Sequence, residues 1–196
     1  AEGLHGNASL SAAPCQDLRL IRLPEEGYWF DADGGGGADE PRIGTRMAIA
    51  AIVETEAGPI CAASTHLESI AAADYRHRQM EVLLDAVDDF AHGLPVVLGG
   101  DLNTGNHMPP DFDWRRETLF DLAEGRGFRW DASAAGDTTQ ASLSTPHPTR
   151  KMRLDWIALR GASGRPMELN PSADKDGRPL SDHLSLFAEV AIDATE

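Results

Sequence analysis

Four clusters of polar residues lie at the ends of short apolar runs, and their side chains are of the kinds that activate water or bind cations. They are Thr65-His66-Leu67-Glu68, Gly99-Gly100-Asp101-Leu102-Asn103, Arg153-Leu154-Asp155 and Ser181-Asp182-His183. A strand end is where a rigid scaffold can hold a side chain over a crevice. Each cluster alone also fits an ordinary role, because Asp and Asn are common turn residues and a histidine can be a satisfied core group. The clusters are therefore informative mainly as a set.

The apolar runs predict the strands that would position these clusters. Alternating apolar and basic residues predict a half-exposed strand over Leu18 to Leu23. Met47 to Val53 and Pro59 to Ser64 flank Glu54-Thr55-Glu56-Ala57-Gly58, as in a hairpin. Further strands are expected over Pro95 to Gly99, Leu154 to Leu159 and Leu184 to Val190.

Two helices and two loops complete the expected organisation. The clearest helix runs from about Ala71 to His92, where apolar residues recur every three or four positions, and a second is expected over Trp114 to Arg126. Glycine-rich Asp31 to Glu40 and polar Asn170 to Pro179 are expected to be loops. Strands and helices that alternate indicate an α/β fold, and residues 1–196 are expected to form one domain.

The order of these motifs along the chain resembles the endonuclease/exonuclease/phosphatase superfamily, from about His5 to Val190. The motifs that carry the resemblance are Gly100-Asp101-Leu102-Asn103, Ser181-Asp182-His183, Thr65-His66-Leu67, Leu154-Asp155-Trp156-Ile157, the central-strand-like His5-Gly6-Asn7-Ala8-Ser9-Leu10-Ser11, and Arg78-Gln79 in the long helix. The resemblance implies a two-sheet α/β sandwich with helices on the outer faces. It also implies hydrolysis of a phosphate mono- or diester by an activated water.

The resemblance assigns acid–base roles to two histidines and one carboxylate. His183 would be the general base that orients or deprotonates the water, which suits an imidazole of unperturbed pKa about 6.5. Asp155 would orient His183, with a carboxylate oxygen about 2.6–3.2 Å from a ring nitrogen. His66 would contact the phosphate or the leaving group as a hydrogen-bond donor or general acid.

The remaining polar motif residues are implied to bind phosphate or metal. Asp101 would activate water or bind a second cation, and Asn103 would donate an amide hydrogen to a phosphate oxygen. Asp182 would be a ligand of Mg²⁺ or Mn²⁺, whose hard character suits carboxylate oxygens. Asn7 stands where the family often has a polar residue near the site, but it also fits a role in tying down a strand end.

One part of the family pattern has no counterpart in this sequence. The family begins with a strand carrying an Asn, then a helix and a strand ending in a metal-binding Glu, and no such unit precedes His5. The expectation is a fold that lacks this N-terminal strand–helix–strand portion and binds metal weakly. The alternatives are a fragment of a longer protein and a natural variant without the usual metal.

The amino-acid composition limits which classes of molecule the protein is expected to bind. The formal net charge is −15, which repels polyanions and favours a small or lipid-derived phosphoester over bulk nucleic acid. Cys15 and Cys61 fit two buried free thiols better than one disulfide, and two cysteines are too few for a zinc site. No membrane-spanning run, signal peptide or feature of an obligate protein partner is evident.

Two other functional classes stay open at this point. A catalytically inactive scaffold or binding domain on the same fold would keep the core and lose site residues. A sugar-binding or structural α/β domain would require the polar motifs to be a coincidence.

Overall fold

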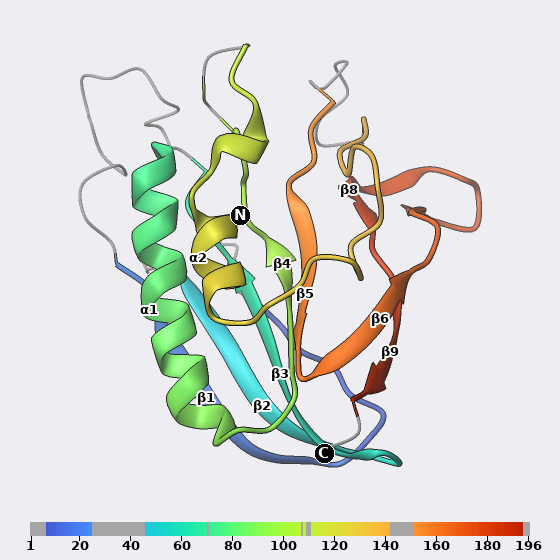
Figure 1. The fold of residues 1–196 in the computed structure, drawn as a ribbon. Helices are drawn as coiled ribbons and strands as arrows, with labels where there is room; N and C mark the ends of the chain where they lie inside the picture. The colour runs from blue at the N-terminus through green and yellow to red at the C-terminus, as the bar shows by residue number, and fades with distance from the viewer. Residues whose placement is uncertain are drawn as a thin grey trace, which may run out of the picture.

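The computed structural model describes residues 7–24, 46–69, 71–106, 108, 111–141 and 151–193. These residues form an α/β domain built on a mixed five-stranded sheet (Figure 1). The strands, in both chain and spatial order, are β1 (Cys15–Arg22), β2 (Met47–Thr55), β3 (Gly58–His66), β4 (Val96–Asp101) and β5 (Asp155–Arg160). Strands β3 and β4 are parallel, and all other neighbours in this sheet are antiparallel. The predicted α/β class and five of the expected strands are confirmed.

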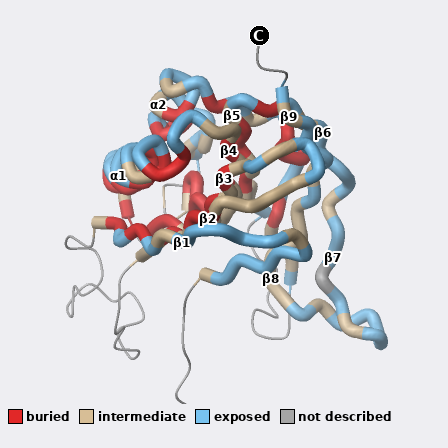
Figure 2. The backbone as a smooth tube through the Cα atoms, turned by 90° about the horizontal axis from the view of Figure 1, so that it is seen from below, coloured by how far each residue is buried: buried red, intermediate tan, exposed pale blue. Residues whose placement is uncertain are grey.

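Two helices lie on one side of this sheet, above it in Figure 2. Helix α1 (Ala73–Ala91) ends at His92 in the left-handed conformation, and Gly93 follows with a positive φ, as the glycine stop predicts. The predicted second helix is two pieces, a 3₁₀ turn at Trp114–Arg116 and α2 (Leu119–Gly125). Glu117 interrupts them because its backbone is extended and its side chain turns inward to Arg76.

The main core fills the space between the helices and the sheet. Buried α1 residues such as Leu83 and Val87 belong to one cluster with Leu98 of β4 and Ala158 of β5. Figure 2 shows the buried segments concentrated between α1, α2 and strands β2 to β5. Burial of this apolar stripe explains why the three- and four-residue spacing in α1 predicted the helix correctly.

The last third of the chain forms two short ladders outside the main sheet. Strand β6 (Ala162–Pro166) pairs with β9 (Ala188–Ile192), and β7 (Asn170–Ala173) pairs with β8 (Pro179–Ser185). The single strand predicted over Leu184 to Val190 was wrong, because β8 and β9 pair with different partners and the chain must turn between them. The predicted loop Asn170 to Pro179 was also wrong in part, since it contains β7. In the described residues, a complete second sheet is replaced by these two-stranded ladders.

The N-terminal segment differs from its expected form. Residues 7–11 are not a strand, and Asn7 Nδ2 donates to the Met47 carbonyl oxygen at 2.5 Å, so Asn7 ties this segment to the start of β2. His5, Gly6 and the Asp31 to Glu40 loop lie outside the described residues.

The two cysteines lie in different surroundings, and both are free thiols. Cys61 is buried as expected, and its burial raises the thiol pKa to about 11. Cys15 is exposed, which corrects the prediction of a second buried thiol; it starts the edge strand β1, most of whose residues are exposed. Neither helix in the described part of the chain is both long and apolar enough to cross a membrane.

Candidate active site

Three of the predicted site residues form one cross-strand row. His66 ends β3, Asp101 ends β4 and Asp155 begins β5. The strand register pairs His66 with Asp101 and Asp101 with Asp155. Because paired residues point to the same face of a sheet, the three side chains lie side by side at one end of the sheet. They share the face opposite to core residues such as Leu98 and Ala158, which alternate with them along the strands.

His183 reaches this row from β8. Its Nδ1 lies 2.7 Å from Asp155 Oδ2, within the range expected from the sequence, and its Nε2 lies 3.9 Å from Asp101 Oδ2. Asp101 Oδ2 also lies 3.3 Å from His66 Nε2. Asp101 therefore stands between two imidazoles, and Asp155 holds one of them from its other side.

A short segment between β8 and β5 fixes His183 beside Asp155. The Leu184 amide donates to the Thr138 carbonyl at 2.7 Å, while Thr138 Oγ1 accepts from the Leu154 amide at 3.0 Å. The Gln140 amide donates to the Asp182 carbonyl at 2.8 Å. The segment 138–140 thus joins the strand that carries His183 to the strand that begins with Asp155. No sequence motif had indicated this role.

Burial and neighbouring charges perturb the protonation of the row. The hydrogen bond that Asp155 accepts from the His183 ring is the largest cause that raises the pKa of His183 to about 9, and the charges of Asp155, Asp101 and Asp182 act in the same direction. Desolvation and the Asp155 charge raise the pKa of Asp101 to about 7. Both Asp101 and His183 therefore hold a proton more tightly than an isolated carboxyl group or imidazole would. Perturbed groups gathered in one place are typical of functional sites.

The turn after Asp101 is shaped by a glycine and a buried amide. A Cβ atom on Gly100 would lie 2.0 Å from the Thr65 carbonyl oxygen, so only glycine permits this approach of β3 and β4. Asn103 is buried, and its Nδ2 donates to the Leu67 carbonyl at 3.0 Å while its backbone N–H donates to Asp101 Oδ1 at 2.8 Å. Asn103 therefore links the chain segments that leave β3 and β4, and at most one of its amide hydrogens is left for a phosphate.

Two carboxylates and one imidazole form a group that could hold a metal ion. Asp101, Asp155 and His183 each offer a ligand atom, and these atoms lie within 4.8 Å of one another. Asp182 is not in this group, although its charge acts on the His183 imidazole. Carboxylate oxygens are the ligands that Mg²⁺ and Mn²⁺ prefer, and Mg²⁺ is commonly held by one or two carboxylates with water completing its shell. The donors present fit such a cation.

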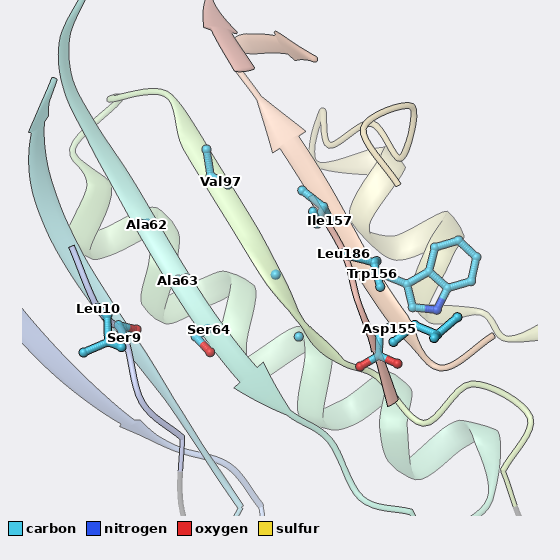
Figure 3. Close-up of a pocket in the computed structure, with 13 residues that line it drawn as sticks. Ser9, Leu10, Ala62, Ala63, Ser64, Val97, Asp155, Trp156, Ile157 and Leu186 are labelled. Carbon is cyan, nitrogen blue, oxygen red and sulfur yellow. The ribbon is translucent and has the colours of Figure 1, made fainter. Parts of the chain in front are cut away.

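A hollow of about 420 Å³ lies next to the row on the same side of the sheet. The residues that line it include Ala62, Ser64, Gly99, Ile157 and Leu184. Figure 3 shows Asp155 at one end of this hollow, with the helices behind the sheet. The hollow forms here because the side chains of β3 and β4 on this face of the sheet are small.

The structure also shows buried polar residues behind the row to which the sequence analysis assigned no role. Arg76 and Glu117 are buried and form an ion pair, and Glu68 is buried against Arg46. Of the pair Arg78-Gln79 that carried the resemblance in this helix, Gln79 is buried and Arg78 is exposed. The spacing could have identified Arg76, because Arg76 and Gln79 are three residues apart and share the apolar face of α1 with Met80.

Comparisons with solved structures show the same fold in several proteins. An endonuclease/exonuclease/phosphatase from Beutenbergia cavernae DSM 12333 has 19% identity and a TM-score of 0.61, with 92% of this chain and 46% of that chain covered. The human Nocturnin catalytic domain with a bound sulfate anion has 21% identity and a TM-score of 0.57, with 91% and 60% covered. The mannosyl-6-phosphatase of Bacteroides thetaiotaomicron VPI-5482 has 14% identity and a TM-score of 0.58, with 91% and 67% covered.

The chain spans only part of the length of these solved structures. It covers 46% of the length of the Beutenbergia chain and 67% of that of the Bacteroides chain. No curated protein sequence matches the chain significantly. A model of the endonuclease/exonuclease/phosphatase family matches residues 15–183, which include the whole cross-strand row and His183. The chain therefore belongs to the endonuclease/exonuclease/phosphatase family.

Proposed function

We propose that this chain carries the acid–base side of a divalent-metal-dependent phosphoesterase site that hydrolyses a phosphate mono- or diester. The observation that carries the proposal is the 2.7 Å contact between Asp155 Oδ2 and His183 Nδ1, set beside Asp101 and His66 in one row. Family membership agrees with it, because the members of this family are metal-dependent phosphoesterases.

His183 is proposed as the general base. Its Nδ1–H donates to Asp155, which leaves Nε2 to accept a proton from the attacking water. Asp155 holds this tautomer and stabilises the imidazolium once the proton has been transferred. Asp155 is paired with Asp101 across β5 and β4, so the carboxylates of Asp155 and Asp101 are carried by rigid strands and not by a loop.

The opposite end of the row is proposed to contact the phosphate. His66 Nε2 faces Asp101, and in its protonated form His66 would donate to a phosphate oxygen or to the leaving group. Asp101 would hold the water or the cation between the two imidazoles. Asn103 would contribute its second amide hydrogen, because the first is bonded to Leu67.

The metal is proposed to be Mg²⁺ or Mn²⁺, held by Asp101 and Asp155, with Asp182 as a further candidate ligand. When bound, such a cation supplies positive charge that polarises the phosphoryl group and favours the neutral form of nearby imidazoles. A general base must be neutral, and the hydrogen bond with Asp155 raises the pKa of His183 to about 9, so the charge of the cation would act against this shift.

The substrate is proposed to be a small or lipid-derived phosphoester. The net charge of −15 opposes association with a polyanion. The Bacteroides mannosyl-6-phosphatase is an example of this fold in a protein named for a small sugar phosphate.

Hydrolysis of bis-p-nitrophenyl phosphate and of p-nitrophenyl phosphate with Mn²⁺ or Mg²⁺ tests the proposal. We expect release of nitrophenol that EDTA abolishes and that His183→Ala reduces by about 10²–10⁴-fold. His92→Asn is the matched control, since His92 caps the far end of α1 in a left-handed conformation that Asn tolerates. Wild-type protein that is folded, binds Mn²⁺ and hydrolyses neither ester would instead indicate an inactive scaffold.

A further inference from the structure

The buried polar residues of this protein are concentrated behind the proposed active row. Nine polar or charged residues are buried within the described ranges, and six of them lie in or against the segments that leave β3 and β4: Glu68, Arg76, Gln79, Asn103, Thr104 and Glu117. Buried polar groups stabilise a fold less than well-packed apolar groups of similar size would. Their concentration at this one place therefore points to a role in geometry.

Arg76 and Glu117 form the centre of this buried set. Both side chains are fully buried, and the guanidinium contacts both carboxylate oxygens, with Nε 3.1 Å from Oε1 and 3.0 Å from Oε2. Arg76 Nη1 also donates to the carbonyls of Ala71 at 2.7 Å and Glu68 at 3.4 Å. Arg76 on α1 thus holds the chain where it leaves β3, at Glu68, two residues after His66.

Glu117 extends the contact to the segment that leaves β4. Its Oε1 accepts a hydrogen bond from the Gly105 amide at 2.7 Å. Gly105 follows Asn103, whose side chain is bonded to Leu67 and whose backbone N–H is bonded to Asp101. The chain of contacts therefore runs from Arg76 through Glu117 to the turn that fixes Asp101 and Asn103.

We propose that Arg76 and Glu117 are positioning residues for the active row. Through the Gly105 amide they hold the turn Asn103 to Asn106 against Glu68 and Ala71, which follow β3, and so set the distance between His66 and Asp101. This proposal rests on the proposed function for its effect on catalysis, but its structural part does not. A displacement of about 1 Å at reacting groups can cost about 10²-fold in rate.

A purely stabilising role is the competing explanation, and a pair of double variants separates the two. Arg76→Met/Glu117→Leu replaces the ion pair by apolar side chains of similar size, a change that is often neutral or stabilising when both partners are replaced. Arg76→Met/Glu117→Gln removes the ion pair equally but keeps an acceptor for the Gly105 amide. Arg126→Ala is the matched control, because Arg126 joins α2 to α1 on the surface through Asp85.

Three measurements are made on the whole chain: thermal unfolding, amide hydrogen exchange of Gly105 by NMR, and kcat and KM for bis-p-nitrophenyl phosphate with Mn²⁺. In the Met/Leu variant we expect a folded protein, Gly105 exchange at least about tenfold faster, and kcat lower by about 10- to 100-fold with little change in KM. The Met/Gln variant is expected to recover the Gly105 protection and kcat only in part, because it restores an acceptor for the Gly105 amide but not the hydrogen bonds of Arg76 to Ala71 and Glu68. Arg126→Ala should resemble the wild type in exchange and kcat.

A folded Met/Leu variant with wild-type Gly105 exchange and wild-type kcat would overturn the proposal. Failure of both double variants to fold would also overturn it, because the pair would then be needed for folding itself. If the wild type hydrolyses no ester, the proposed function fails, and Gly105 exchange with the Asn103 side-chain amide resonances still decides whether the pair positions the turn.

Discussion

The residue on which most of the proposed chemistry depends is His183, because its state is set by contacts on both sides of the ring. Asp155 lies 2.7 Å from Nδ1, and Asp101 lies 3.9 Å from Nε2. Asp155 thus tunes the pKa of the His183 imidazole through one ring nitrogen. Asp101 faces the other ring nitrogen across the position proposed for the attacking water. Two predictions concern His183.

The first concerns protonation in the metal-free chain. NMR titration of the ring signals should give His183 a pKa of about 9, and Asp155→Asn should lower it because the Asp155 hydrogen bond is the largest cause of the shift. Since the folded pKa lies above the ordinary value of 6.5, this interaction stabilises the fold fully below pH 6.5 and the contribution is lost as pH rises through about 9. The stability difference between wild type and Asp155→Asn in urea should therefore shrink from pH 6 to pH 10. A His183 pKa near 6.5 in the wild type would show that the contact does not form in solution.

The second concerns catalysis with metal bound. Asp155→Asn should keep the fold yet reduce kcat, because an amide can stabilise the wrong tautomer of His183 and cannot balance an imidazolium. The double variant Asp155→Asn/His183→Ala should lose far less than the product of the two single losses, since the residues act as a unit. Steady-state kinetics with melting curves as a folding check measure this. Independent, multiplicative losses would contradict the paired role of the two residues.

At the level of secondary structure, the site depends on how closely β3 and β4 approach at their ends. Strand pairing puts His66 beside Asp101 and Thr65 beside Gly100. A side chain at position 100 would have to displace the β3 backbone and not merely a flexible neighbour.

Two adjacent glycines allow a matched test of this approach. Gly100→Ala should reduce stability by about 2–4 kcal/mol, because a Cβ 2.0 Å from the Thr65 carbonyl forces the strands apart. Gly99→Ala is the control, since its Cβ would have its nearest contact at 3.8 Å, from the Trp156 carbonyl. Urea unfolding of both variants gives the comparison. Equal, small losses in the two would mean that the strands are not so close in solution.

The whole molecule contributes a strong negative field. With 32 acidic and 17 basic residues, the chain repels polyanions at distances beyond direct contact. Salt screens such long-range effects, with a Debye length of about 30 Å at 0.01 M and about 8 Å at 0.15 M.

The salt dependence of KM tests the preference for small substrates. With Mn²⁺ present, KM for a single-stranded oligonucleotide should fall as salt rises from about 0.01 to 0.15 M, because screening weakens repulsion. KM for bis-p-nitrophenyl phosphate, which carries one charge, should change little. An oligonucleotide KM that rises with salt would reveal a local basic surface and favour a nucleic-acid substrate.

The sequence alone determined those features that depend on neighbours along the chain. The α/β class, helix α1 and the five strands of the main sheet follow from local apolar spacing and from Gly93 as a stop. The motifs around His66, Asp101, Asp155 and His183 could be identified because the types of residue and their order along the chain can be read from the sequence alone.

Tertiary structure decided the features that depend on partners distant in sequence. The cross-strand row exists because β4 pairs with both β3 and β5 in one particular register, and a shift of one residue would move a side chain to the other face. The division of the last predicted strand into β8 and β9 follows from their different partners, β7 and β6. The ion pair of Arg76 with Glu117 spans 41 positions, so local spacing shows at most that Arg76 faces inward, and only the packing of α1 against the segment before α2 shows what it meets.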